Sequence, residues 1–376
     1  MSTQSNGHSG NGNGNKPLGE AVSAESEAGS SVSGRVAPPP GQLKKADFVS
    51  DQEVRWCPGC GDYAILNNVQ KVMPELGIPR EKIVFVSGIG CSSRFPYYMN
   101  TYGMHSIHGR APAIATGLAS SRQDLAVWVV TGDGDALSIG GNHLIHALRR
   151  NVNFKILLFN NRIYGLTKGQ YSPTSELGKI TKSTPFGSLD TPFNPVSLAL
   201  GAEATFVART MDSDRKHLTS VLRAAAQHQG TALVEIYQNC NIFNDGAFEV
   251  LKDAATRDDW TIRLEHGEPV RFGTEGSKAV VRSSAGVLTI EDGLAADDPR
   301  VVVHDARAAD PAYAFALSRL SSIDPRYTPM GVFRSVDRPA YDAMMAGQLE
   351  RAATQAPGDD AALQTLLAGA DTWKVA

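Results

Sequence analysis

The sequence predicts an α/β protein in which a parallel β-sheet is covered by helices on both faces. Short apolar runs alternate with amphipathic segments of about ten residues along the middle of the chain. The apolar runs lack the polar alternation of a half-exposed strand, so both faces of the sheet are expected to be buried. With 376 residues and 42% hydrophobic residues, the chain can build a substantial core.

The predicted elements follow in order. Apolar, β-branched runs such as "IVFVS" and "FKILLFN" predict strands at 83–87, 125–132, 154–160, 204–208 and 232–238. Segments with helical spacing of apolar residues predict helices at 111–121, 138–150, 213–229 and 339–353. Because strands and helices alternate, these units are expected to form one parallel sheet.

Three regions differ in composition. Residues 1–41 are rich in Gly, Ser and Asn and contain no aromatic residue, which predicts a disordered tail. Residues 42–250 carry the alternating pattern and are expected to form the main domain. Residues 251–376 are less periodic, and we expect them to form an appended region that packs on the core or on a partner subunit.

Charge and hydropathy exclude several classes of protein. The net charge is −3 and no run of Lys or Arg exceeds two residues, so neither nucleic acid nor an anionic membrane is an expected partner. No apolar run approaches the ~20 residues of a membrane span. Without a secretory pattern at its beginning, the chain is expected in the cytoplasm, where thiols stay reduced.

Polar residues follow two of the predicted strands. Asp133 lies in "GDGD" after the strand at 125–132, and Asn161 lies in "NNRIYG" after the strand at 154–160. Ligands bind outside the carboxyl ends of parallel strands, and carboxylate and amide oxygens suit Mg²⁺ with a bound phosphate. Two unrelated turns are the alternative. However, GDG followed by 25 residues and NN is the pattern of thiamine-diphosphate enzymes.

Four cysteines form a second candidate site. Cys57 and Cys60 lie in "WCPGCGDY", Cys91 in "SGIGCSSRFP" and Cys240 in "YQNCNIF". A reducing compartment disfavours disulfides, and the spacing fits zinc and an iron-sulfur cluster equally well, with a redox dithiol less favoured. Cys91 follows the strand at 83–87, near the expected diphosphate site. This placement favours an electron-accepting [4Fe-4S] cluster.

Taken together, four blocks of sequence resemble a known family. "WCPGCGDYAIL", "SGIGCSSRFPYYMNTYGMHSIHGRAPAIATGL", "GDGDALSIGGNHLIHALRRN" and "NNRIYGLTKGQYSPTS" are similar to the β subunits of 2-oxoacid:ferredoxin oxidoreductases, and within them to the 2-oxoglutarate enzymes. The similarity covers roughly residues 47–250, and "GVFRSVDRPAYD" at 331–342 resembles the C-terminal segment of the family.

The resemblance implies cofactors and the residues that hold them. One [4Fe-4S] cluster would be held by Cys57, Cys60, Cys91 and Cys240. Mg²⁺ would be bound by Asp133, Asn161 and the carbonyl of Ile163. Thiamine diphosphate would be lined by Ile89, Gly90, Cys91, Ser92, His108, Gly134, Asp135, Gly165 and Leu166. A buried structural histidine is the alternative for His108.

The resemblance also implies an activity. This is the reversible, coenzyme A-dependent oxidative decarboxylation of 2-oxoglutarate to succinyl-CoA and CO₂, with electrons passed through the cluster to ferredoxin. A separate α subunit, in an αβ or α₂β₂ complex, would supply the glutamate that activates thiamine, so this chain alone is expected to be inactive. A β subunit for pyruvate or branched-chain 2-oxoacids is one alternative, and a non-enzymatic scaffold with structural zinc is another.

Two residues are candidates for substrate recognition. Arg94, three residues after Cys91, has a planar guanidinium suited to a carboxylate, although a surface or subunit-contact arginine is the alternative. Leu166 lies in "IYGLTKGQ", where the resemblance suggests a role in choosing among 2-oxoacids. His143 and His146 share a helix face but have no visible third ligand, so we assign them to packing or to an interface.

Overall fold

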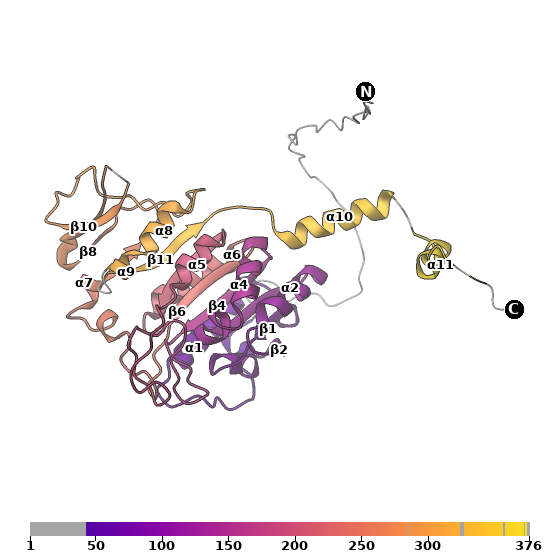
Figure 1. Ribbon diagram of the computed structural model, residues 1–376, viewed down its shortest axis with the longest axis horizontal. Coiled ribbons are helices and arrows are strands. Elements are labelled where there is room, and N and C mark those ends of the chain that lie inside the picture. The colour runs from indigo at the N-terminus through magenta and orange to yellow at the C-terminus, as the bar shows by residue number, and fades with distance from the viewer. Residues whose placement is uncertain (1–42, 285, 324–326, 356–357, 372, 374–376) are drawn as a thin grey trace, which may run out of the picture. The chain divides into compact units, whose positions relative to one another are not determined.

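An eight-stranded sheet forms the centre of the fold in the computed structural model, which describes residues 43–284, 286–323, 327–355, 358–371 and 373 (Figure 1). The predicted tail at 1–41 lies outside the described residues. The strand order is β2-β1-β3-β4-β6-β5-β11-β7. The strands are β1 (Ile83–Ser87), β2 (Tyr102–His105), β3 (Ala126–Gly132), β4 (Phe154–Asn160), β5 (Phe206–Met211), β6 (Ala232–Tyr237), β7 (Thr261–Leu264) and β11 (Thr328–Ser335).

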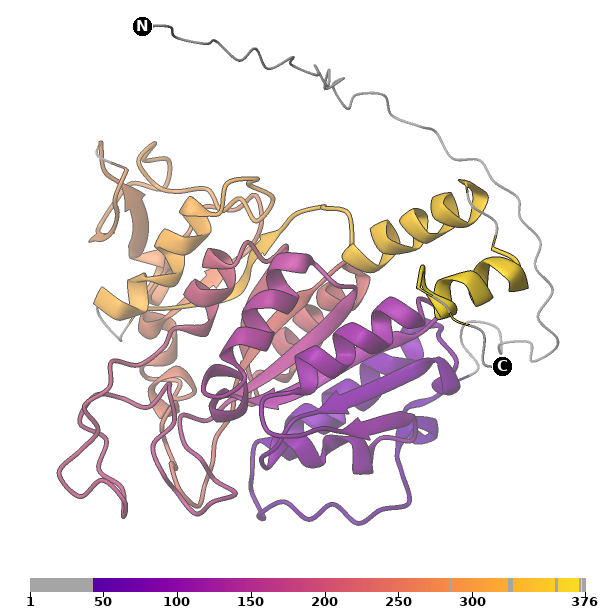
Figure 2. The same cartoon turned by 45° about the vertical axis from the view of Figure 1, so that its right-hand side comes forward.

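The first six strands run parallel, and helices cover both faces of their sheet (Figures 1 and 2). Alternate side chains of each strand point to opposite faces. In β1, Val84 and Val86 belong to a hydrophobic cluster that includes residues of α2 (Ala111–Ser121), α4 (Gly141–Arg150) and α5 (Pro195–Gly201). Ile83 and Phe85 belong to a second cluster, which includes residues of α1 (Asp62–Val72) and α6 (Arg215–Gln227). The predicted parallel sheet with helices on both faces is confirmed.

Several predicted boundaries are wrong. The strand expected at 204–208 spans Phe206–Met211, and the helix expected at 213–229 spans Arg215–Gln227. The helix expected from Ser138 begins at Gly141, because a separate short helix, α3 (Asp133–Leu137), starts directly after β3 and ends where Ser138 leaves the helical region at φ −90° and ψ −111°. The strand expected from residue 204 begins at Phe206. Thr205 is instead buried before the strand, where its hydroxyl bonds Asn151 and His228.

Residues beyond 250 contribute to the same sheet. β11 pairs antiparallel with β5, and β7 pairs parallel with β11. The helices of this region are α7 (Arg257–Trp260), α8 (Ala312–Ser318), α9 (Leu320–Ile323), α10 (Tyr341–Gln355) and α11 (Asp360–Ala368). A separate antiparallel sheet consists of β8 (Arg271–Phe272), β9 (Lys278–Arg282) and β10 (Leu288–Asp292). The helix predicted at 339–353 corresponds to α10.

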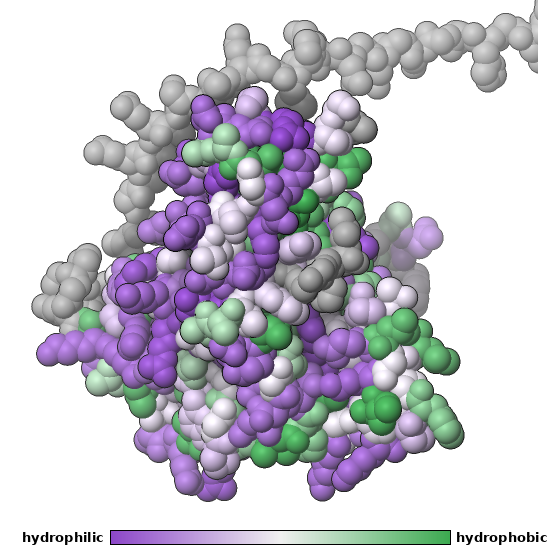
Figure 3. Space-filling view, turned by 90° about the vertical axis from the view of Figure 1, so that its left-hand side faces the viewer, coloured by the Kyte–Doolittle hydropathy of each residue, from purple (hydrophilic) through white to green (hydrophobic). Residues whose placement is uncertain are grey.

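The surface is mixed in character on the face that Figure 3 shows, where small groups of hydrophobic side chains lie among hydrophilic ones toward the lower edge. Exposed large hydrophobic residues are concentrated in the long loop between β4 and α5, where they include Leu177, Ile180, Phe186 and Leu189. Among the described residues, no helix combines the length and the apolar character that crossing a membrane requires.

Candidate functional site

The candidate site lies where the loops after β1, β3, β4 and β6 meet at the carboxyl edge of the sheet. These strands are neighbours in the order β1-β3-β4-β6, so the loops after them are neighbours as well. One pocket is lined by residues at or after the ends of these four strands, by His108 after β2 and by Asp62. This is the position at which open parallel sheets bind ligands.

The three predicted Mg²⁺ ligands line this pocket together. Asp133 and Ile163 are buried, at 2% and 3% exposure, and Asn161 is half-buried. The side-chain oxygen of Asn161 accepts a hydrogen bond from the backbone N–H of Ile163 at 3.1 Å, which fixes the turn that brings both residues to the pocket. Carboxylate, amide and backbone carbonyl oxygens are the donors that Mg²⁺ prefers, so the donor set fits the ion.

Burial raises the pKa of Asp133 to about 6, although hydrogen bonds from Ser172 and Thr174 oppose the shift. A cation in the pocket would favour the ionised carboxylate, because the carboxylate has lost most of its contact with water.

The predicted thiamine-diphosphate residues also line the pocket. Its walls include Ile89, Gly90, Cys91, Ser92, His108, Gly134, Asp135, Gly165 and Leu166. Gly134 has a steric reason to be glycine, because a Cβ there would lie 2.2 Å from Cε1 of Tyr164. The Tyr164 hydroxyl donates to the carbonyl of Gly134 at 2.8 Å, which links the loop after β4 to the loop after β3.

Asp135 and His108 form a pair at one side of the pocket. Nδ1 of His108 lies 2.5 Å from Oδ1 of Asp135, and the same oxygen accepts backbone N–H groups of Gly109 at 2.7 Å and Ile89 at 3.1 Å. The hydroxyl of Thr131 donates to the other oxygen at 2.6 Å. Asp135 therefore connects the loop that carries Ile89 to the loop that carries His108 and Gly109. It also orients the ring of His108, whose Nε2 remains available to a ligand.

All four cysteines are free thiols, and Cys91 is among the residues that line this pocket. A Cβ on Gly165 would lie 3.5 Å from Sγ of Cys91 and 3.8 Å from Sγ of Cys240, so both sulfurs flank this glycine. The amide of Gln238 donates to Sγ of Cys60 at 3.2 Å. The N–H of Gly61 donates to the carbonyl of Asn239 at 3.1 Å, which joins the CxxC turn to the loop that carries Cys240.

The cysteines differ in exposure: Cys57 is exposed, whereas Cys60, Cys91 and Cys240 are half-buried. Burial, with the charge of Asp62 as the second cause, raises the pKa of Cys91 to about 12 and that of Cys60 well above its usual range. These thiols would bind metal as thiolates, so loading must release their protons. In the part of the chain that the structure describes, no three His, Cys, Asp or Glu side chains lie close enough together to hold a single metal ion.

Arg94 lies near Cys91 but is not among the residues that line the pocket. Its Nε donates to the Tyr98 hydroxyl at 3.0 Å, and its charge acts to lower the pKa of Cys91. Leu166, in contrast, lines the pocket and is 53% exposed. The roles of Arg94 and Leu166 in substrate recognition stay predictions.

The sequence interpretation missed several residues of the pocket, among them Asp62, Phe159, Thr167 and Gln238, and it left Tyr164 without a role. Asp62 is buried, and the described residues offer neither of its carboxylate oxygens a hydrogen bond. Its place directly after the CxxC motif was the only signal in the sequence, because the contact with the pocket depends on how α1 packs.

Comparisons with known proteins agree with the fold. The family model described as "Thiamine pyrophosphate enzyme, C-terminal TPP binding domain" matches residues 88–236. The fold is therefore that of a thiamine-diphosphate-binding domain.

Individual relatives are more specific. The chain is 66% identical over 332 residues to the 2-oxoglutarate oxidoreductase subunit KorB of Mycobacterium tuberculosis, and the alignment covers 88% of each chain. It is 46% identical over 192 residues to the 2-oxoacid:ferredoxin oxidoreductase subunit beta of a Sulfolobus species, which covers 50% of this chain and 63% of that subunit.

A solved structure is similar over most of the chain. It is described as 2-oxoglutarate:ferredoxin oxidoreductase from Magnetococcus marinus with 2-oxoglutarate, coenzyme A and succinyl-CoA bound. The TM-score is 0.70 at 35% identity, and the match covers 88% of this chain and 97% of that chain. The chain belongs to the family of 2-oxoacid:ferredoxin oxidoreductase β subunits, which confirms the resemblance seen in the sequence.

Proposed function

We propose that the chain is the β subunit of a 2-oxoglutarate:ferredoxin oxidoreductase that holds thiamine diphosphate, Mg²⁺ and one [4Fe-4S] cluster. The reaction consumes 2-oxoglutarate, coenzyme A and two oxidised ferredoxins, and yields succinyl-CoA, CO₂, two reduced ferredoxins and a proton. The observation that carries this proposal is the position of Cys91, which lines the same pocket as Asp133 and Asn161. An electron acceptor held there would lie beside the cofactor.

Each part of the pocket has a task in this proposal. Asp133, Asn161 and the carbonyl of Ile163 would hold Mg²⁺. Nε2 of His108 would be available to the diphosphate, because Asp135 holds the other ring nitrogen. Thiamine supplies the electron sink that decarboxylation of a 2-oxoacid requires, and the protein positions it.

The cysteines supply the route for electrons. We propose that Cys57, Cys60, Cys91 and Cys240 hold the cluster, with Cys91 and Cys240 nearest the cofactor on either side of Gly165. Cys57 is exposed, so it marks the side from which ferredoxin would approach. The cytoplasm, where thiols stay reduced, is the compartment in which such a site would be loaded.

The complete enzyme is proposed to contain an α subunit of the KorA type in an αβ or α₂β₂ complex. The names of the relatives support this, because they describe subunits rather than whole enzymes. The α subunit would supply the activating glutamate, so the β subunit alone is expected to lack activity.

The substrate is proposed from the relatives and from the pocket. The Mycobacterium tuberculosis subunit and the Magnetococcus marinus structure are both named for 2-oxoglutarate. Arg94 near Cys91 remains the candidate for binding a carboxylate of this acid, and Leu166, which lines the pocket, remains the candidate for selecting among 2-oxoacids. Pyruvate or a branched-chain 2-oxoacid is the alternative substrate.

The test is anaerobic purification of the chain together with its α subunit. We expect about four irons and four sulfides per β chain, broad absorbance near 400 nm and thiamine-dependent reduction of ferredoxin that is fastest with 2-oxoglutarate. Zinc in place of iron and sulfide would favour the scaffold alternative. A preference for pyruvate would keep the family and overturn the proposed substrate.

A further inference from the structure

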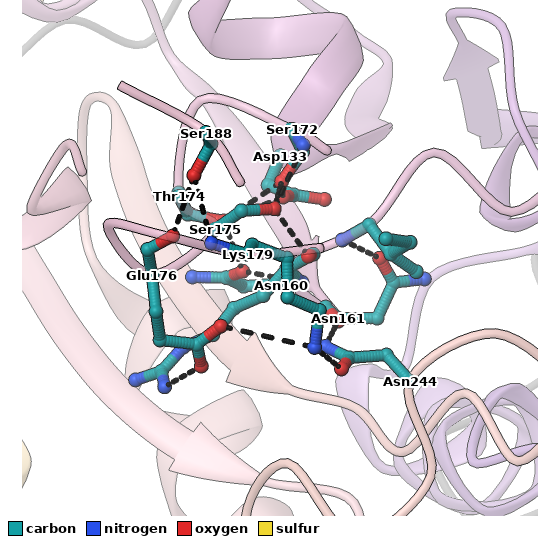
Figure 4. A network of polar contacts seen from close by, with 12 residues as sticks. Asp133, Asn160, Asn161, Ser172, Thr174, Ser175, Glu176, Lys179, Ser188 and Asn244 are labelled. Atoms are coloured by element: carbon teal, nitrogen blue, oxygen red, sulfur yellow. Dashed lines mark hydrogen bonds and ion pairs between the residues drawn. The ribbon is translucent and has the colours of Figure 1, made fainter. Parts of the chain in front are cut away.

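Two hydroxyl groups donate hydrogen bonds to the carboxylate of Asp133, a predicted Mg²⁺ ligand. Ser172 and Thr174 approach its Oδ2 at 2.5 and 2.6 Å, and both side chains are buried. They belong to the segment 171–176, which follows the Asn160-Asn161 turn and folds back over the end of β3. Figure 4 shows both hydroxyls directed at Asp133.

The two carboxylate oxygens of Asp133 therefore differ in their hydrogen-bond partners. Oδ2 receives both hydroxyls, whereas Oδ1 accepts no side-chain hydrogen bond among the described residues. A carboxylate held in this way presents one oxygen to the pocket in a fixed orientation. Such outer-sphere hydrogen bonds orient metal ligands and raise the affinity of the site.

A second layer of buried groups holds Thr174. Its hydroxyl also lies 2.9 Å from Oδ1 of Asn160, and Nδ2 of Asn160 donates to Glu235 at 2.7 Å. Glu235 in turn accepts from Nε of Arg209 at 2.6 Å, in an ion pair whose side chains are at most 1% exposed. The chain of contacts therefore runs from the middle of the sheet to the metal ligand.

The same segment is also attached to the Asn161 turn. The Ser175 hydroxyl donates to the carbonyl of Arg162 at 2.6 Å and accepts the N–H of Ser172 at 2.8 Å. From the other side, the Asn244 amide donates to the carbonyl of Asn161 at 2.9 Å. This polar network thus orients the side chain of Asp133 and anchors the backbone of the turn that carries Asn161 (Figure 4).

We propose that Ser172 and Thr174 are positioning residues of the metal-diphosphate site, which hold Asp133 in the orientation that binds Mg²⁺. The inference rests on the proposed function, because it assumes that Asp133 binds the metal. Ser172 and Thr174 act through Asp133, so they set the affinity for Mg²⁺ and do not take part in the chemistry of the substrate.

The experiment uses the αβ complex with Thr174→Val, Ser172→Ala and the conservative Thr174→Ser. Thr174→Val keeps the shape of the side chain and removes its hydroxyl. We expect the Mg²⁺ concentration for half-maximal thiamine-diphosphate binding, followed by quenching of tryptophan fluorescence, to rise about 10- to 100-fold in Thr174→Val and Ser172→Ala. Thr174→Ser is expected to restore it, and saturating Mg²⁺ is expected to restore kcat.

Matched controls separate this role from a general loss of structure. Thr289→Val makes the same change at an exposed position of β10 and is expected to behave as the parent complex. Cluster absorbance and the thermal midpoint report the integrity of each variant.

Three results bear on the inference separately. Unchanged Mg²⁺ affinity in both hydroxyl deletions would overturn it. A kcat that stays low at saturating Mg²⁺, in variants with an intact cluster and thermal midpoint, would also overturn it, because the residues would then act on the chemistry. If the parent complex itself bound no thiamine diphosphate in a Mg²⁺-dependent manner, the proposed function would fail first.

Discussion

Asp135 shows how one buried carboxylate holds several loops of the site together. It accepts two backbone N–H groups, the ring of His108 and the hydroxyl of Thr131, so every contact needs an acceptor at this position. Asp135→Asn would place an amide N–H₂ against one of these donors. We expect the free energy of unfolding to fall by about 3 kcal/mol, because buried donors would lose a charged acceptor.

Urea denaturation of the purified chain measures this change. Asp297→Asn, at an exposed position outside the helices and strands, is the matched control. If Asp135→Asn changed the free energy of unfolding no more than Asp297→Asn, the hydrogen bonds that Asp135 accepts would not stabilise the fold.

At the residue scale, the sequence predicted the positions of those site residues that directly follow a strand. Asp133, Asn161 and Cys91 each follow a predicted strand by a few residues, so the parallel sheet brings them together. Ser172 and Thr174 gave no such signal, because they lie in a long loop without periodicity. The short hydroxyl-rich "SPTS" was the only hint. Arg94, predicted to take part in substrate recognition, is not among the residues that line the pocket, and its Nε donates to the Tyr98 hydroxyl.

At the scale of elements, the buried ion pair of Arg209 and Glu235 joins β5 to β6 behind the site. Arg209 also lies over the rings of Tyr237 and Phe333. Glu235→Gln leaves the guanidinium without a counter-charge in the core. We expect the free energy of unfolding to fall by about 3–5 kcal/mol, since an unpaired buried charge costs far more than the pair itself contributes.

The double variant Arg209→Met with Glu235→Leu gives a sharper comparison. It removes both charges, so we expect stability to recover to within about 2 kcal/mol of the parent chain in urea denaturation. Equal losses in the single and the double variant would show that packing, rather than charge, governs this position.

The elements differ in how well the sequence predicted them. Strands β1, β3, β4 and β6 are continuous apolar runs and were placed within one residue at each end. The start of α4 was missed because a separate turn of helix and Gly140 precede it, and because its first residue is Gly141. The pairing of β11 with β5 joins residues more than 100 positions apart, and no local pattern reports such a contact.

At the scale of the whole molecule, two histidines link stability to pH. Burial lowers the pKa of both His217 and His228 to about 4. For His217, Arg263 acts in the same direction and Asp214 opposes it. For His228, Lys155 lowers the pKa further and Asp337 opposes it. Both rings bond threonine hydroxyls, of Thr210 and Thr205 respectively.

The sign of the effect follows from proton binding. The unfolded chain, with histidines near pKa 6.5, binds more protons than the folded chain between pH 6.5 and 4, so this stabilisation is present above pH 6.5 and is lost as the pH falls toward 4. Each histidine is expected to lower the free energy of unfolding by about 2 kcal/mol between pH 7 and 5.

In the variant His217→Gln with His228→Gln, the urea midpoint should therefore fall less steeply over this range than in the parent chain. His146→Gln, on the exposed side of α4, is the control and should keep the parent slope. A double variant with the parent slope would place the pH dependence in other groups.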